Sequence, residues 1–219
     1  MSTAGRSAPF PRGFLTGDTP GAARALIGAR LTRGSGPDAC SGRIIEVEAY
    51  IGQEDLASHA RVGRTTRNAV MFGPPGAAYV YLVYGMHNCL NVVTEAEGRP
   101  AALLIRAVEP VAGVDWMRAA RRAGSRAAAQ DHSRLDALPS SRLAAGPGLV
   151  CAAFSIDRSQ NGTDLCDPAS DLRLEIAPDD DELPIETGPR VGIAYAPEPW
   201  LSMPWRFFVP NSPALSVAK

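Results

Sequence analysis

Two carboxylates fall within an apolar, β-prone segment, residues 42–50, which reads Gly-Arg-Ile-Ile-Glu-Val-Glu-Ala-Tyr. The alternation of this segment predicts a β-strand over residues 43–50. Its apolar face comprises Ile45, Val47 and Ala49, and its other face comprises Glu46, Glu48 and Tyr50. A carboxylate in the middle of a strand is unfavourable unless that face is wet, ion-paired or in use. The polar face of this strand is therefore a candidate for a functional site.

Two further β-prone runs, 78–84 and 89–94, predict a β-hairpin because they are joined by Gly85-Met86-His87-Asn88. The side chains that alternation places on one side of it are Tyr79, Tyr81 and Val83. Tyr84 lies at the rim, where its side chain can project beyond the sheet. An arginine series separates the strand from the hairpin and consists of Arg61, Arg64 and Arg67. Residues 43–91 thus gather more aromatic and polar side chains than packing requires.

The remaining pattern predicts a helix over 20–30 that is capped by the Asp18 segment, a helix over 113–123 and another after Gly146. Strands are predicted over 101–108, 172–176, 190–194 and 205–209. Residues 1–12 read as a disordered tail and residues 124–144 as a variable, partly helical connection. With 219 residues, 45% of them hydrophobic, and no internal repeat, we expect one domain over residues 13–216.

Composition excludes several classes of protein. No apolar run is long enough for a membrane span and no signal peptide is evident, so we expect a cytoplasmic protein. The four cysteines form no Cys-x-x-Cys pair and the histidines no His-x-x-x-His spacing, so we expect no metal site. The motifs of Ser-His-Asp hydrolases, P-loops and dinucleotide sites are missing. The only lysine is Lys219, which excludes an internal lysine Schiff base.

A carboxylate, an arginine and an aromatic cage remain as the candidate chemistry. Arg106 interrupts the apolar run 101–108, and either serves a function or pairs with a residue such as Glu109. The aromatic cage comprises Tyr50, His59 and Tyr81. Aromatic faces hold flat, cationic rings, and a carboxylate such as Glu48 can deprotonate water or stabilise an oxocarbenium ion. The set suits cleavage of a bond between a sugar and a planar base, although each aromatic residue taken singly could be an ordinary core residue.

Several motifs in matching order resemble the 3-methyladenine (alkyladenine) DNA glycosylase family from about Phe14 to Ser216. The motifs are Glu-Val-Glu-Ala-Tyr-Ile-Gly at 46–52 with Glu54-Asp55 and His59, Arg67-Asn68, Met71-Phe72, Tyr-Val-Tyr-Leu-Val-Tyr-Gly-Met at 79–86, Leu-Ile-Arg-Ala-Val-Glu-Pro at 104–110, Gly146-Pro147, Gly-Pro-Arg-Val-Gly-Ile at 188–193 and Pro-Trp-Arg-Phe-Phe-Val at 204–209. Together with the predicted elements, the resemblance implies an α+β fold. We expect a single compact domain with a mainly antiparallel, curved sheet, a protruding β-hairpin and flanking helices.

The resemblance also implies roles for individual residues. Glu48 would activate water as the general base, and Arg106 would help to hold that water and a backbone phosphate. The cage would enclose a flipped base, and Asn91 at the pocket floor would disfavour the 2-amino group of guanine. Tyr84 would wedge into the minor groove. The residues expected to contact DNA are Tyr84, Met86 and Arg64.

The expected activity is hydrolysis of the N-glycosidic bond of alkylated purines, and of deaminated or etheno purines if the pocket is broad. Without an internal lysine the product would be an abasic site with an intact backbone. We expect double-stranded DNA as the partner, no cofactor and a monomer that needs no membrane. The net charge is −1, yet residues 58–158 carry twelve arginines against seven acidic residues, which is compatible with DNA. The alternatives are a free-nucleoside hydrolase, a non-catalytic damaged-DNA-binding protein and, on fold alone, a one-carbon transferase-like binding module.

Overall fold

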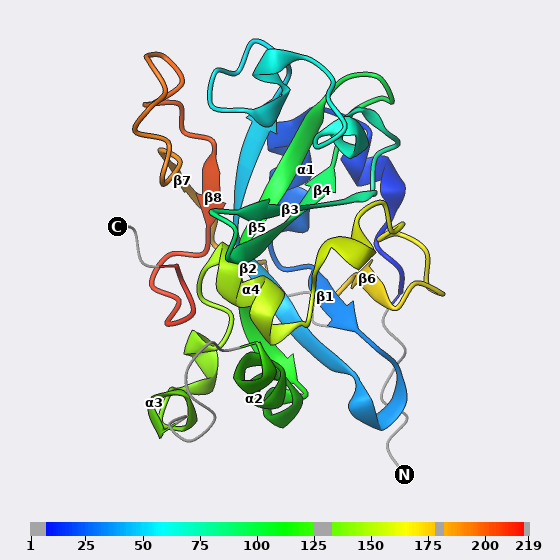
Figure 1. Cartoon of the computed structure of the whole chain (residues 1–219), viewed down its shortest axis with the longest axis vertical. Helices are drawn as coiled ribbons and strands as arrows, with labels where there is room; N and C mark the ends of the chain where they lie inside the picture. Colours follow the sequence, from blue (N-terminus) through cyan, green and yellow to red (C-terminus); the bar gives the residue numbers. More distant parts are fainter. Residues whose placement is uncertain (1–7, 125–132, 178–181, 217–219) are drawn as a thin grey trace.

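Two long strands, β2 (Cys40–Ile51) and β5 (Ala101–Ala112), pair antiparallel at the centre of the sheet (Figure 1). The computed structural model describes residues 8–124, 133–177 and 182–216. The other strands are β1 (Arg30–Arg33), β3 (Ala78–Val83), β4 (His87–Val93), β6 (Leu172–Glu175), β7 (Glu186–Gly188) and β8 (Arg206–Phe208). Among the described residues the sheet has eight strands in the order β3-β4-β5-β2-β1-β6, with β8 joining β2 to β7. Every pairing is antiparallel, and helices flank the sheet, so the expected single α+β domain is confirmed.

Strand β2 changes its neighbour along its length. Residues 40–43 pair with β1, whereas Glu46 to Glu48 pair with β8. At the change the register with β5 shifts twice, so that the pairing skips Ile45 in β2 and Arg106 in β5. A bulge of this kind re-aims side chains locally. The bulge lies beside the buried cluster of Glu46, Glu48 and Arg106.

The bulge corrects one predicted face. Val47 and Ala49 belong to the main hydrophobic core, but they share it with Ile44 rather than with Ile45. Ile45 packs in a separate cluster with Ala107 and Ala214. The prediction that Ile45 lies on the face of Val47 is therefore wrong, because a strict period of two does not continue through an inserted residue.

The described α-helices are α1 (Thr19–Leu26), α2 (Val114–Ala123), α3 (Ser133–Asp136) and α4 (Pro147–Ala153). Asp18 caps α1, since its carboxylate accepts a hydrogen bond from the backbone N–H of Gly21 at 2.8 Å. The helix ends earlier than predicted because Ile27 is extended and Gly28 has φ +89°, so that the chain enters β1 at Arg30. Helix α1 packs on β2 and β5, α4 packs on β4 and β5, and α2 packs on α4. These contacts enclose the main core.

The hairpin has a tighter turn than predicted. Its central residues are Tyr84 and Gly85, with φ values of +50° and +66°, and the N–H of Met86 donates to the carbonyl of Val83 at 3.0 Å. Positive φ at both central positions is the requirement of a type I′ turn, in which Gly is common and a bulky aromatic residue is strained. The predicted connection over 85–88 is wrong because His87 already belongs to β4.

Other predictions need correction or fall outside the described residues. The predicted strand over 190–194 is wrong: the chain forms bends and turns there, with Gly192 at φ +80°. Within the predicted tail, Phe10 is buried in the main core, and its N–H donates to the carbonyl of Leu174 at 3.0 Å. Residues 1–7 and 125–132 lie outside the described residues. No helix in the described ranges is long and apolar enough to cross a membrane.

We expect Ile105→Ala to lower the free energy of unfolding by about 2–5 kcal/mol, because Ile105 is fully buried on the core face of β5. Val111→Ala on the same strand is the matched control. Val111 is 48% exposed, and its truncation should cost no more than about 0.5 kcal/mol. Urea titrations followed by circular dichroism measure both. Equal losses in the two variants would show that the core does not lie on this face.

Candidate active site

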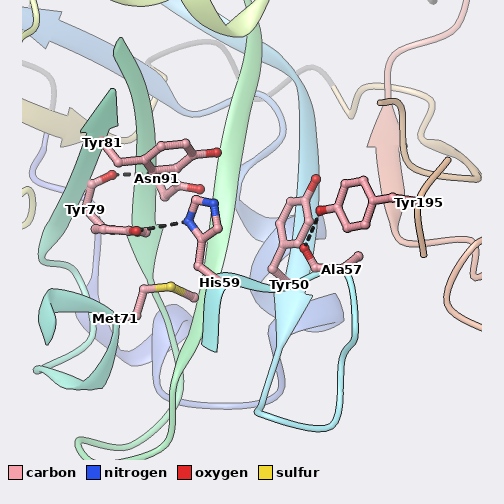
Figure 2. Close-up of a pocket in the computed structure, with 8 residues that line it drawn as sticks. All are labelled: Tyr50, Ala57, His59, Met71, Tyr79, Tyr81, Asn91 and Tyr195. Atoms are coloured by element: carbon pink, nitrogen blue, oxygen red, sulfur yellow. Dashed lines mark hydrogen bonds between the residues drawn. The ribbon is translucent and has the colours of Figure 1, made fainter. Parts of the chain in front are cut away.

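A pocket of about 60 Å³ opens between β2, the β3–β4 hairpin and two loops (Figure 2). Its lining residues are Tyr50, Ala57, His59, Met71, Tyr79, Tyr81, Asn91 and Tyr195. All three residues of the predicted aromatic cage and Asn91 are among them. The predicted polar face of β2 and the predicted tyrosine face of the hairpin therefore meet at one site.

One wall of the pocket is a cluster of aromatic rings. His59 and Tyr81 touch edge to face with ring centroids 4.5 Å apart, and Tyr79 packs 5.2 Å from Tyr81. The hydroxyl of Tyr79 lies 3.0 Å from Nδ1 of His59. Burial, together with the nearby charges of Arg67 and Arg61, lowers the pKa of His59 to about 4, so this imidazole is neutral at pH 7.

Tyr50 stands across the pocket from His59, with Tyr195 beside it (Figure 2). Because His59 and Tyr81 already touch one another, the open space of the pocket lies between this pair and Tyr50 (Figure 2). The amide of Asn91, which is only 4% exposed, donates from Nδ2 to the carbonyl of Tyr79 at 3.0 Å. That bond fixes the orientation of the amide against the aromatic wall.

Glu48 lies behind Tyr50 and is fully buried. Its Oε2 accepts a hydrogen bond from the hydroxyl of Tyr50 at 2.9 Å and lies 3.2 Å from Nη1 of Arg106. Its Oε1 accepts from the backbone N–H of Val191 at 2.6 Å. Burial raises the pKa of Glu48 above its ordinary value, although Arg106 and the two hydrogen bonds act in the opposite direction. A carboxylate whose pKa is raised in this way is a stronger base once it is ionised.

Arg106 is buried between two carboxylates. Its Nε donates to Oε1 of Glu46 at 2.9 Å, and its Nη2 donates to the hydroxyl of Ser216 at 3.1 Å. Glu46 is fully buried, and Arg206 also donates to it at 2.7 Å. Burial alone would raise the pKa of Glu46, but Arg106, Ser216 and Arg206 hold it below its ordinary value. The alternative partner Glu109 is wrong, because Arg106 pairs with the polar face of β2.

The residues predicted to contact DNA lie on the surface and line no part of the pocket. Tyr84 is 88% exposed at the hairpin turn, and Met86 is 53% exposed two residues later. Arg64 is exposed, with its guanidinium 5.9 Å from the ring centroid of Phe72. The hairpin thus holds Tyr81 in the pocket wall and Tyr84 in solvent.

Sequence reasoning missed Tyr195 and a buried ion pair of Asp55 with Arg190. Tyr195 donates from its hydroxyl to the carbonyl of Ala57 at 3.0 Å and lies in a turn, where no periodicity marks it. Asp55 and Arg190 each lie in a motif named above, but no local sequence pattern predicts a contact between residues 135 positions apart. Among the described residues no group of three or more His, Cys, Asp or Glu side chains could hold a metal ion.

Comparison with known proteins identifies the family. The family model described as methylpurine-DNA glycosylase matches residues 13–213. A protein of Methanocella arvoryzae is 46% identical over 94% of this chain and 95% of its own length. One from Anaeromyxobacter dehalogenans is 44% identical over 94% of this chain and 85% of its own, and one from Koribacter versatilis is 39% identical over 98% and 96%. Each of the three is named "Putative 3-methyladenine DNA glycosylase". The chain belongs to the methylpurine-DNA glycosylase family.

Proposed function

We propose that this protein excises alkylated purines from double-stranded DNA by hydrolysing the N-glycosidic bond. The observation that carries this proposal is the fully buried carboxylate of Glu48, with its raised pKa, hydrogen-bonded to a wall of an aromatic pocket. Family membership supports the same reaction. The pocket accounts for recognition of a planar base, and Glu48 for its removal.

The base enters between Tyr50 on one side and His59 with Tyr81 on the other. A purine alkylated at N3 or N7 in DNA carries a positive charge, and aromatic faces attract cations. His59 is neutral at pH 7 and adds no repulsion. Asn91 at the floor disfavours the 2-amino group of guanine. Deaminated and etheno purines share the flat shape but lack the charge, so they are held by stacking alone.

In the chemical step, the oxygen of a water bonds to the anomeric carbon while the electron pair of the glycosidic bond leaves with the purine. The departing cationic purine becomes neutral, and the proton of the water passes to Glu48. Arg106 lies 3.2 Å from the accepting carboxylate and helps to hold the water and a backbone phosphate. The only lysine is Lys219, so no internal lysine forms a Schiff base, and the enzyme leaves the backbone of the abasic site intact.

A base inside a duplex is out of reach, so the nucleotide must rotate out of the stack at a cost of a few kcal/mol. Tyr84 fills the vacated space, supported by Met86 and Arg64. The strained turn favours this role, because a tyrosine held at φ +50° at the tip of a hairpin costs stability that packing does not return. The site is complete within one chain, which suits a monomer acting on cytoplasmic DNA without a cofactor.

The first test is single-turnover excision from methylated duplex DNA, with one duplex carrying hypoxanthine and one carrying only adenine. We expect release of 3-methyladenine, no release of adenine and no strand cleavage beyond spontaneous breakdown. Glu48→Gln should bind the methylated duplex normally but lose at least about a hundredfold in rate. Excision by this variant at the normal rate would refute Glu48 as the base. A wild-type protein that binds but releases no base would be a damage-binding protein.

The pH dependence of excision should shift in opposite directions in two variants. Tyr50→Phe removes a hydrogen bond to ionised Glu48, which raises the pKa of Glu48, so the acid limb of the rate profile moves to higher pH. Glu46→Gln removes a neighbouring negative charge, which lowers the pKa of Glu48 and moves the limb to lower pH. The assay must use 3-methyladenine as the base that leaves, because the fixed positive charge of this base adds no titration of its own to the acid limb. Shifts of equal sign would contradict this account of Glu48.

Tyr84→Asn should separate stability from function. Asn tolerates positive φ, so the free energy of unfolding should rise by about 1 kcal/mol. Loss of the wedge should slow excision of a paired lesion by about tenfold, and should matter less for a mispaired lesion, which leaves the stack more easily. Thermal unfolding and single-turnover rates on the two duplexes measure the effects. Equal slowing on both duplexes would exclude the wedge.

A further inference from the structure

A buried ion pair lies directly behind Tyr50. The side chains of Asp55 and Arg190 are both 0% exposed and are joined at 2.6 Å and 3.0 Å by two hydrogen bonds from the guanidinium to the carboxylate. The guanidinium carbon of Arg190 lies 4.7 Å from the ring centroid of Tyr50 and 5.0 Å from that of Trp205. Neither member of the pair lines the pocket. Arg190 therefore packs against both the Tyr50 ring and the Trp205 ring, outside the lining of the pocket.

The pair also fixes the loop beside Tyr50. The carboxylate of Asp55 accepts from the backbone N–H groups of Ile51 at 3.2 Å and Ala57 at 3.0 Å. The carbonyl of Ala57 in turn accepts from Tyr195. Arg190 donates to the carbonyl of Ala49 at 2.9 Å, next to Tyr50 in β2. The pair thus contacts the backbone beside Tyr50 and Ala57, two residues of the pocket lining.

The charge of the pair matters for what Tyr50 can bind. A cation on one face of an aromatic ring is attracted by the ring, but a second cation on the opposite face is repelled by the first. Arg190 occupies one face of Tyr50, and a cationic base would occupy the other. Neutralisation of Arg190 by Asp55 removes this repulsion at the pocket face of Tyr50.

We propose that Asp55 and Arg190 are positioning residues that set the preference of the pocket for cationic bases. Arg190 packs on one face of Tyr50, and Asp55 cancels its charge. The other buried charges near Tyr50 are Glu46, Glu48 and Arg106, and their charges balance together with that of the partly buried Arg206. Loss of Asp55 would therefore leave one net positive charge behind the ring. This inference rests on the proposed excision of alkylated purines.

The test compares Asp55→Asn with the double variant Asp55→Asn/Arg190→Gln. The single variant keeps an uncompensated guanidinium, whereas the double variant replaces the ion pair by neutral side chains. We expect the single variant to release 3-methyladenine at least about tenfold more slowly in single turnover, and the double variant to recover to within about threefold of wild type. Affinity for a duplex carrying the neutral isostere 3-deaza-3-methyladenine should change less than about threefold in both.

A purely structural role gives a different result. The double variant would then be as slow as the single variant or slower, and affinity for the neutral isostere would fall in parallel; either outcome overturns the proposal. If the single variant does not fold, the double variant is tested alone. Release of 3-methyladenine by the double variant at a tenth of the wild-type rate, with normal affinity for the isostere, would also overturn the proposal. Asp164→Asn is the matched control, because it removes the ion-pair partner of Arg12 and neither residue lines the pocket. Its excision rate should match that of wild type. Inactive wild-type protein would instead refute the proposed function.

Discussion

The structure depends on one arginine buried between two carboxylates. Glu46, Arg106 and Glu48 are buried inside the sheet, where an unpaired charge would be costly. Arg106 offsets that cost for both carboxylates at once. The sheet in turn accommodates the cluster by skipping Ile45 and Arg106 in the pairing of β2 with β5. The irregular register and the buried charges are thus two aspects of one arrangement.

The same cluster sets the chemistry of Glu48. An arginine shared with Glu46 neutralises Glu48 less completely than a dedicated partner would, so burial dominates and the pKa of Glu48 is raised. Glu46 receives more hydrogen bonds, and its pKa is lowered. Two carboxylates only two residues apart on one strand therefore have opposite shifts. Glu46 holds the ion-pair network together, and Glu48 is the carboxylate that we propose as the base.

The two walls of the pocket are supported in different ways. The rings of His59, Tyr81 and Tyr79 pack against one another and form one wall. This wall is aromatic, and its imidazole is neutral at pH 7. Tyr50 instead leans on the guanidinium of Arg190, whose charge is cancelled by Asp55. Both arrangements keep ring faces towards the pocket, and the charge of the buried arginine behind Tyr50 is paired. Such a site suits a flat ligand that brings its own positive charge.

Much of the architecture was readable from local patterns. The cap of α1 at Asp18, the long strand that carries Glu48 and the hairpin that carries Tyr81 follow from capping and alternation, which act over a few residues. The same local patterns predicted the kinds of side chain that lie at the pocket. Alternation failed at Ile45, because a bulge depends on what the neighbouring strand can accept.

The sequence by itself determined which faces of which elements are apolar and which carry the reactive side chains, because helix and strand periodicity are local properties. Only the tertiary structure decided that Arg106 pairs with Glu46 and Glu48 rather than Glu109, that Tyr195 joins the pocket, and that Asp55 meets Arg190. Each of these contacts requires strand register and loop closure over many residues. Their energies come from burial that exists only after the chain has folded.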